Sequence, residues 1–444
     1  MRALAARLLM EQFLAEGGAY GHLMHLYDNR DLTFAELKEV LSAGAEGRLE
    51  KATEKTDGMN LVFTWDARDG GVKGARSAGD IKKGGQDLAG LAARWAGKAG
   101  KEVVQEAFTT AFKLLSDAIN SLPDKVKVQV FGPEGNTWYS MEIIYPANAN
   151  VINYDKNYIV FHAHGSFQLG KDGKVVSSAS APGIAILEKH IDKMQNALSQ
   201  RSWQIAAPQL ARLKKLSDGS VLSRALSEIE AAQGAAGVGD DATIDDYLHK
   251  LMAEEVADLD LPPKAAIAVV ARALGDEGAP GLNDIKKMLP KEIYPNVNEF
   301  IKASPAVLKK LIAPIEHAIH KFSVEVLRGM QSVMVASHDK EVERLRGEVS
   351  KAVKAIESSG DVKAMSILKD QLSKLQNLED IASSSEGVVF HFKGNTYKFT
   401  GAFAPVNQIL GLFKYGRSGT KIAATESLYL RQTIDDMIAR NTVL

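Results

Sequence analysis

The sequence contains no cysteine, which excludes disulfide bonds, thiolate metal sites and cysteine nucleophiles. This absence fits a reducing compartment, and we expect a cytoplasmic protein. No apolar segment is long enough to span a membrane, so we expect no membrane partner. Positive and negative charges almost cancel, at a formal net charge of -1, so a basic surface for nucleic acid would have to be local. A Walker-type lysine loop and a dinucleotide-binding glycine pattern are both missing, which excludes two common kinds of nucleotide site.

The 444 residues, 45% of them hydrophobic, are enough for a sizeable core and predict two or three domains. The pattern of residues 1–50 predicts a helical segment, in which Thr33 and Glu36 have the spacing of a capping box. The first residues combine Arg2 and Arg7 with apolar side chains. We interpret them as an amphipathic helix rather than a targeting peptide.

Between residues 51 and 181 the pattern predicts mainly strands. The stretch "MNLVFTWDARDGGVKGARS" predicts a hairpin that turns at Asp69-Gly70-Gly71. A helical pattern follows and ends before Pro123. Further strands are predicted for "KVKVQVFG", "WYSMEIIYP", "YIVFHAHGSFQL" and "KVVSSAS", the first because its polar and apolar residues alternate.

Residues 182–382 are almost entirely helix-like and include a helical hairpin that is expected to turn near Ser359-Gly360. A β-hairpin follows in "EGVVFHFKGNTYKFTG". We therefore predict an α+β fold with antiparallel sheets, all in one sheet system, interrupted by a large all-helical insertion. The expected parts are an N-terminal helical segment (1–50), an α+β domain (51–181 and 383–405), a helical insertion domain (182–382) and a C-terminal helical tail (406–444).

The stretch "EKTDGMNLVF" places a lysine directly before a tight turn and a strand. The pattern Lys55-x-Asp57-Gly58 is weak alone, because a lysine before a turn is usually a solvated charge. Several downstream residues change this interpretation by their types and their order. They are Arg76 in "GARSAGD", Glu142 in "MEIIYP", Phe161 in "YIVFHAH", Glu386 in "SEGVVFHF" and Lys398 in "TYKFTG".

With these companions the chain resembles the covalent nucleotidyltransferase superfamily, which comprises ATP-dependent DNA ligases, RNA ligases and mRNA capping enzymes. The first motif of that family, Lys-x-(Asp/His)-Gly-x-(Arg/Asn/Ser), is matched by Lys55, Asp57, Gly58 and Asn60. The resemblance implies the ligase adenylation fold, with Lys55 as the nucleophile and the other three residues at the nucleotide. It covers roughly residues 50–168 and 384–402 and leaves the helical insertion outside.

The resemblance also implies roles around the nucleotide. Glu54 is similar to the glutamate that helps to hold adenine in phage-type RNA ligases, and Phe161 to the aromatic residue that stacks on the base. Arg76 is similar to the arginine on the strand after the first motif. Glu142 resembles the third-motif glutamate, which lies near the ribose.

Glu386 and Lys398 resemble the fourth and fifth motifs. The fourth-motif glutamate serves metal and phosphate; the fifth motif usually has two lysines, and here has one. The chemistry needs the same set, because a lysine amine attacks the α-phosphorus of ATP only when neutral, and its free pKa is about 10.4. Burial and nearby cations such as Arg76 and Lys398 lower that value and neutralise charge on the transferring phosphoryl group. Mg²⁺ keeps water ligands, so Glu386 with phosphate oxygens is an adequate site.

Some of these residues have an equally good structural explanation. A strand aromatic such as Phe161 is more often a core residue than a platform for a base. Glu54 beside Lys55 is commonly one half of a solvated pair. His162 and His164 share one strand face and are interpreted as surface residues or as supports of the site. These alternatives remain open at the level of sequence.

The region after the fifth motif favours one branch of the family. About forty residues follow Thr400, which is too short for the five-stranded barrel that DNA ligases and capping enzymes usually carry. Our leading hypothesis is an ATP-dependent polynucleotide ligase, with RNA favoured over DNA as the partner, that uses ATP and Mg²⁺ or Mn²⁺. The alternatives are a nucleotidyltransferase that modifies another acceptor and a ligase-like nucleic-acid-binding module without activity. The likeness to phage enzymes also favours a virus-encoded protein that acts in the host cytoplasm.

Overall fold

The computed structural model describes residues 23–410 except 99, 149–150, 179, 209–210, 331–333, 336, 376–380, 382, 384, 402, 404–405 and 408. The chain divides into two compact units, of which the first contains the described parts of Met1–His338 and Ser383–Gly401. The second contains those of Asp339–Ala382 and Ala402–Leu444. The amphipathic helix expected at the N-terminus lies outside the described residues, as does most of the expected helical tail. In the part of the chain that the structure describes, no helix has the length and apolar character required to cross a bilayer.

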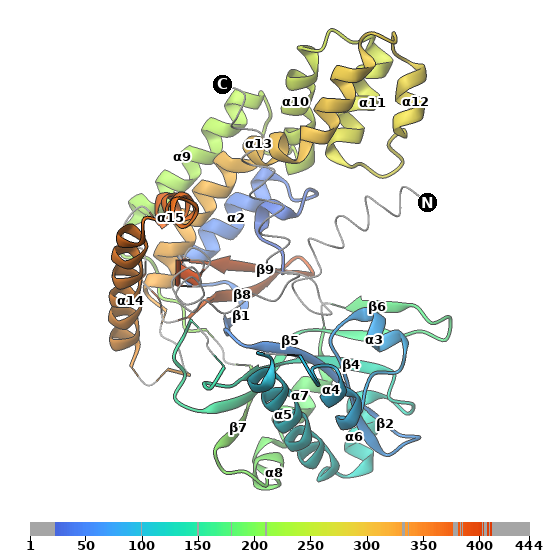
Figure 1. Cartoon of the computed structure of the whole chain (residues 1–444), viewed down its shortest axis with the longest axis vertical. Helices are drawn as coiled ribbons and strands as arrows, with labels where there is room; N and C mark the ends of the chain where they lie inside the picture. The colour runs from blue at the N-terminus through green and yellow to red at the C-terminus, as the bar shows by residue number, and fades with distance from the viewer. Residues whose placement is uncertain are drawn as a thin grey trace. The chain divides into compact units, whose positions relative to one another are not determined.

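The larger of the two sheets formed by the described residues has the strand order β3-β2-β4-β5-β6, and β7 pairs with β5 (Figure 1). Its strands are β2 (Met59–Asp66), β3 (Gly71–Ala75), β4 (Thr137–Ile144), β5 (Asn157–Leu169), β6 (Val175–Ser178) and β7 (Trp203–Ala206). Every pair is antiparallel except β5 with β7, which run parallel. The hairpin predicted around residues 69–71 is confirmed as β2 and β3.

Short helices and one long helix pack against the larger sheet. They are α3 (Ala78–Lys82), α4 (Leu88–Ala93), α5 (Glu102–Asn120), α6 (Asp124–Phe131), α7 (Pro182–Glu188) and α8 (Ile191–Asn196). Helix α5 contributes the buried Phe108 and Phe112, which share one hydrophobic core with Phe63 and Phe161 of the sheet. It ends before Pro123, as predicted.

One predicted strand is a helix. The residues "KVKVQVFG" form α6 from Asp124 to Phe131, although their polar and apolar residues alternate. Pro123 at the N-cap and Gly132, with φ 81°, after the last turn are both helix-boundary signals. The alternating pattern suggests a strand whose lysines face solvent. Lys127 is instead buried, with its ammonium 4.6 Å from the centre of the Trp65 ring, so the pattern does not separate a solvent face from a buried face.

A smaller sheet joins distant parts of the chain, so the strands do not form the single sheet system that we expected. Its first strand, β1 (Glu50–Lys55), pairs antiparallel with β8 (Gly387–Phe392), and β8 pairs with β9 (Asn395–Thr400). The predicted β8–β9 hairpin is confirmed. Lys55 lies opposite Gly387, although 332 positions separate them.

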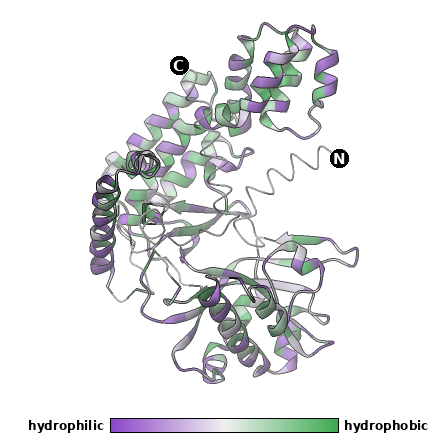
Figure 2. Ribbon diagram, in the orientation of Figure 1, coloured by the Kyte–Doolittle hydropathy of each residue, from purple (hydrophilic) through white to green (hydrophobic). Residues whose placement is uncertain are grey.

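The helices from the middle of the chain share a hydrophobic core with the smaller sheet. They are α9 (Gly219–Ala236), α10 (Ile244–Ala257), α11 (Pro263–Leu274), α12 (Leu282–Lys287) and α13 (Tyr294–Arg328), joined by α2 (Phe34–Ala45) and the short η2 (Leu26–Asp28). The rings of Phe322 in α13 and Phe399 in β9 lie 5.8 Å apart. Figure 2 shows hydrophobic and hydrophilic residues alternating along α9 and α13, as expected for helices with one buried side.

The expected insertion domain of residues 182–382 is therefore divided among three parts. Its first segment carries α7, α8 and β7, and packs on the larger sheet. Helices α9 to α13 share the core of the smaller sheet. The second unit contains nearly all of α14 (His338–Ser359) and α15 (Val362–Leu375), the predicted helical hairpin, which turns at Gly360 with φ 68°. The insertion is thus neither all-helical nor a separate domain.

Candidate active site

The turn after Lys55 carries the chain from one sheet to the other. Lys55 is the last residue of β1 in the smaller sheet, and Met59 is the first residue of β2 in the larger sheet. The three residues between them are Thr56, Asp57 and Gly58. A side chain at the end of β1 therefore lies where the two sheets meet.

Lys55 forms an ion pair with Glu386, the residue directly before β8. Both side chains are mostly buried, at 21% and 19% exposed. The Ser385 hydroxyl donates a hydrogen bond to the carbonyl oxygen of Lys55 (3.1 Å). This bond connects the residues just before β8 with the end of β1. The pairing of two strands that are distant in sequence thus brings the predicted nucleophile and the predicted metal ligand together.

Lys398 lies on the same face of the smaller sheet as Lys55. Thr53, Val389 and Lys398 form one row across the three strands, and Lys55 follows Thr53 by two residues. Burial and the nearby charge of Lys55 lower the pKa of Lys398, while Glu386 opposes that change. Three of the residues selected from sequence therefore share one electrostatic environment.

Asp57 connects the lysine turn to the loop that follows β4. Its carboxylate accepts hydrogen bonds from the backbone N–H groups of Val151 (2.9 Å) and Ile152 (3.3 Å). Its own N–H donates to the buried hydroxyl of Tyr154 (2.8 Å). Burial and the charge of Glu386 raise the pKa of the Asp57 carboxyl to about 6, although the two backbone N–H groups oppose this shift. We call these three contacts the Asp57 latch.

Gly58 is required by the close approach of Glu142. A Cβ atom at Gly58 would lie 2.6 Å from Glu142 Cγ and 2.8 Å from the carbonyl oxygen of Ile143. Glu142 lies opposite Asn60 in the β2–β4 pair, and its Oε2 is 2.8 Å from Nε2 of His162. The first motif and the predicted ribose contact are therefore packed together.

Asn60 and Arg76 form the part of the site on the larger sheet. Asn60 donates a hydrogen bond to the Ser140 hydroxyl, and its side-chain oxygen is buried without a hydrogen-bond partner among the described residues. Arg76 donates to the carbonyl oxygen of Asn60 (2.5 Å), and its guanidinium lies 4.7 Å from the centre of the Phe108 ring. Burial and the neighbouring Arg94 lower the pKa of Arg76, while the charge of Glu142 opposes that change. The side-chain oxygen of Asn60 is therefore a buried acceptor whose hydrogen-bonding capacity is unused among the described residues.

Phe161 does not lie where a stacking residue would have to lie. It is fully buried, 5.5 Å ring-to-ring from Phe63, and it pairs with Met141 in the core. Because side chains alternate along a strand, Phe161 points away from the face that carries Glu142. That face instead carries Val160, opposite Glu142, and His162. The assignment of Phe161 to base stacking is therefore corrected to a core role.

Glu54 is almost fully buried and does not belong to a solvated surface pair. It lies opposite Val388, so the alternation of β1 separates it from the face of Lys55. Burial raises the pKa of Tyr154, and the charges of Asp57 and, to a smaller extent, Glu54 add to this shift, so Glu54 lies near the Asp57 latch.

Two contacts of the site were not selected from sequence. His162 was interpreted only as a surface or supporting residue. Glu142 pairs with Val160, and His162 follows Val160 by two residues, so the side chain of His162 lies on the same face as Glu142. Tyr154 had no distinguishing signal, since an isolated tyrosine in an asparagine-rich loop is unremarkable.

A second group of possible metal ligands lies away from Lys55. Among the described residues, one trio of His and acidic side chains has ligand atoms close enough to hold an ion: Asp245, His249 and Asp276. The guanidinium of Arg30 already lies 2.5 Å from Asp245 Oδ1 and 3.4 Å from Asp276 Oδ1. A cation in this trio would compete with Arg30, so we interpret the cluster as an ion-pair network.

Comparisons with known proteins give no independent identification: no family profile, no curated protein and no solved structure matches this chain.

Proposed function

We propose that this protein is an ATP-dependent polynucleotide ligase that acts through a covalent lysyl-AMP, with RNA favoured over DNA. The observation that carries the proposal is that Lys55 pairs with Glu386 and shares a sheet face with Lys398, although both residues lie more than 300 positions after Lys55 in the sequence. A surface lysine before a turn would need neither a buried carboxylate partner nor a second lysine on its face.

The first step forms one bond and breaks one. The neutral amine of Lys55 attacks the α-phosphorus of ATP, the bond to the bridging oxygen of the β-phosphate breaks, and pyrophosphate leaves with the electron pair. Glu386, already paired with Lys55, would accept the proton that the amine must lose before its carboxylate takes up the metal ion. Lys398 and Arg76 would stabilise the charge on the transferring group.

The charge of the site fits a requirement for a divalent cation. Three basic side chains face three acidic ones: Lys55, Arg76 and Lys398 against Asp57, Glu142 and Glu386. This balance leaves the charge of a bound triphosphate without compensation, which Mg²⁺ would supply. Glu386 and phosphate oxygens would hold the ion, because hard cations prefer oxygen ligands and Mg²⁺ retains part of its water shell.

In the later steps AMP would pass from Lys55 to a 5′-phosphate, and a 3′-hydroxyl would displace it. The buried oxygen of Asn60, the guanidinium of Arg76 and the carboxylate of Glu142 are the groups that would hold the nucleotide. The preference for RNA rests on the resemblance to phage-type RNA ligases and on no contact in the structure.

The test is incubation with ATP labelled at the α-phosphate and Mg²⁺, followed by a denaturing gel. We expect label on the wild type and none on Lys55→Ala, while Lys113→Ala, which removes an exposed lysine of α5, keeps its label. A 5′-phosphorylated RNA strand should then release the label and be joined to a 3′-hydroxyl end. Label without joining would favour a nucleotidyltransferase that modifies another acceptor. No label with ATP, GTP or NAD would overturn the catalytic proposal in favour of a binding module.

A further inference from the structure

Helix α3 lies on the face of the larger sheet that carries Asn60 and Glu142. Asn60 donates a hydrogen bond to Ser140, and Glu142 follows Ser140 by two residues, so these side chains share one face. Val62, two residues after Asn60, points the same way and packs in one buried cluster with Ile81 of α3. Figure 1 shows α3 beside β6, which it contacts together with β3. Helix α3 therefore covers the part of this face that adjoins the candidate active site.

Two exposed lysines stand at the end of this helix. Lys82 is the last residue of α3, and Lys83 follows it. Among the described residues, neither lysine has an ion-pair partner. The acidic residue closest to them in sequence, Asp80, is already engaged, since its carboxylate accepts from the N–H of Arg76 (2.9 Å) and pairs with Arg94 (3.0 Å). The two lysine charges are thus available to a ligand.

The turn that carries the lysines is fixed at both ends. Before it, Ile81 is fully buried. After it, Gln86 exchanges two backbone hydrogen bonds with Gly74 of β3, each 2.8 Å long. Gly85 packs so closely on the sheet that a Cβ atom there would lie 2.5 Å from Trp138 Cη2. The backbone therefore holds the lysines in place, in contrast to a loop that is free in solvent.

The segment around the lysines is strongly basic, although the whole chain has 54 basic and 55 acidic residues. Residues 71–101 contain two acidic residues, Asp80 and Asp87. Their basic residues are Lys73, Arg76, Lys82, Lys83, Arg94, Lys98 and Lys101. Positive charge gathered in one segment of a nearly neutral protein favours an anionic partner.

The exposure of Lys82 and Lys83 indicates an anion that is longer than a mononucleotide. A nucleotide whose α-phosphate reaches Lys55 meets Lys398, which is buried, and Arg76, which is half-buried. A polynucleotide that presents its 5′-phosphate at the same place has to continue past these residues to the surface. It carries one phosphate per nucleotide, and lysines bind phosphates as point charges.

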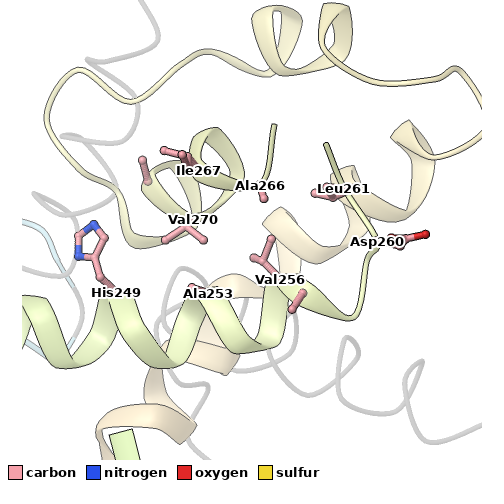
Figure 3. A pocket seen from close by; sticks show the side chains of 10 residues that line it. His249, Ala253, Val256, Asp260, Leu261, Ala266, Ile267 and Val270 are labelled. Carbon is pink, nitrogen blue, oxygen red and sulfur yellow. The ribbon is translucent and has the colours of Figure 1, made fainter. Parts of the chain in front are cut away.

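The groove in Figure 3 offers no comparable contact for phosphate. It lies between α10 and α11, its lining is mostly apolar, and no Lys or Arg belongs to that lining. Asp260, its acidic residue, would repel a phosphate. Between these two surfaces, the charge favours the end of α3.

We propose that Lys82 and Lys83 bind phosphates of the polynucleotide strand whose 5′-phosphate receives AMP. The contact does not depend on base sequence, because phosphates carry no sequence information. This inference rests on the proposed function for the identity of the ligand. It adds a path for the strand, from Lys55 across the face of the larger sheet to the end of α3.

The experiment measures binding of a fluorescent, 5′-phosphorylated RNA strand of about 16 nucleotides to the full-length protein. Fluorescence anisotropy is recorded without ATP over a range of salt concentrations. The double variant Lys82→Gln/Lys83→Gln should bind at least about tenfold more weakly at low salt. The slope of log affinity against log salt should shrink by about 1.4, since each phosphate contact on a single strand contributes about 0.7. Strands of different sequence should lose affinity equally.

The matched control is Lys214→Gln/Lys215→Gln. These lysines are also adjacent, exposed and without an ion-pair partner among the described residues. The segment that carries them bonds through its backbone to Ala45 of α2 and Ala52 of β1, away from α3. This variant should bind RNA as the wild type does. Lys82→Arg/Lys83→Arg keeps both charges and should retain most of the affinity, and urea unfolding checks that every variant is folded.

Lysyl-AMP formation is measured on the same proteins, because that step involves no RNA. Weaker RNA binding by Lys82→Gln/Lys83→Gln, with no lysyl-AMP on the wild type, would support the phosphate contact and reject the ligase proposal. Lysyl-AMP on the wild type, with RNA binding unchanged in the double variant, would overturn the contact and leave the ligase proposal standing. A raised KM for ATP with unchanged RNA binding would assign the lysines to the triphosphate. An equal loss in Lys214→Gln/Lys215→Gln would show an effect of net charge alone and would also overturn the contact.

Discussion

At the scale of residues, Gly58 shows how closely the turn after Lys55 approaches β4 of the larger sheet. A Cβ atom at Gly58 would lie 2.6 Å from Glu142 Cγ, which leaves no room for a side chain. The neighbour cannot simply move away, because Glu142 is paired with His162 and the next contact is the backbone oxygen of Ile143. The glycine of the Lys-x-Asp-Gly sequence therefore has a physical reason that is specific to this site.

We predict that Gly58→Ala displaces the turn that follows Lys55 from Glu142 and lowers both activity and stability. Overpacking should cost about 1–3 kcal/mol of unfolding free energy. Lysyl-AMP formation should fall by at least about tenfold, since small displacements of reacting groups have large kinetic effects. Urea unfolding and α-phosphate labelling measure the two effects. Gly71→Ala is the control, because a Cβ atom there would lie 4.0 Å from its nearest neighbour, the carbonyl oxygen of Asp69, and it should change neither.

Asp57 makes stability depend on pH in an unusual direction. Its pKa is raised from 3.8 to about 6 in the folded protein, so the native state binds a proton more readily than the unfolded chain. Protonation therefore stabilises the fold, and the unfolding free energy should fall as pH rises from about 4 to about 6. The full effect is at most about 3 kcal/mol, and above pH 6 this group adds no further slope.

The measurement is urea unfolding of wild type and Asp57→Asn between pH 4 and 7. The asparagine keeps an acceptor for the N–H groups of Val151 and Ile152 but cannot ionise. We expect the variant to lose the downward slope, whereas Asp117→Asn, a change on an exposed part of α5, should retain it. Parallel curves for wild type and Asp57→Asn would contradict the assignment.

At the scale of elements, the Asp57 latch fixes the loop after β4 to the turn after β1. We predict that Tyr154→Phe leaves the Asp57 N–H without its acceptor and costs about 1–3 kcal/mol of stability. Because the change displaces the turn that carries Lys55, the rate constant of adenylate formation should fall more than the apparent affinity for ATP. Single-turnover labelling over a range of ATP concentrations separates the two quantities.

Tyr158→Phe is the matched control for this prediction. Its hydroxyl bonds Asp155 (3.1 Å) and takes no part in the latch, so its loss should leave the rate nearly unchanged. Equal effects of the two substitutions would mean that Tyr154 acts through general packing alone.

The elements also show which features the sequence was able to predict. The capping box of Thr33 and Glu36 is present at the start of α2, because it depends only on residues three positions apart. The hairpins were predicted for the same reason, since their turns and strands are contiguous. Helix α6 was missed because the buried contact of Lys127 with Trp65 reverses the meaning of the alternating pattern. Sequence patterns therefore predict an element correctly when contacts between neighbouring residues determine its structure, and they fail when a contact with a residue distant in sequence determines it.

In the candidate site, too, residues close in sequence could be predicted and contacts between distant residues could not. Lys55, Asp57 and Gly58 could be selected because they form one short motif. For Phe161, stacking on the base and a core role remained equally open, because sequence does not give the register that sets Met141, rather than Glu142, opposite it. The contact of Lys55 with Glu386 needs the pairing of β1 with β8, which no local pattern contains.

At the scale of the whole molecule, the smaller sheet and the helices behind it form one core rather than a domain and its insertion. Phe399 of β9 is fully buried and contacts Phe390 of β8 and Phe322 of α13. Phe112 of α5 is equally buried in the core of the larger sheet. These two phenylalanines allow the cores to be perturbed one at a time.

We predict that Phe399→Ala lowers amide protection in α9 and α13 together with that in β8 and β9. The truncation should cost about 3–5 kcal/mol, and a shared core transmits this loss to every element that it contains. Hydrogen exchange measured by mass spectrometry reports protection segment by segment. Phe112→Ala should instead expose α5 and its neighbours and leave α9 and α13 less affected. If α9 and α13 keep full protection in Phe399→Ala, they fold independently of the smaller sheet, and the separate insertion domain expected from sequence would be restored.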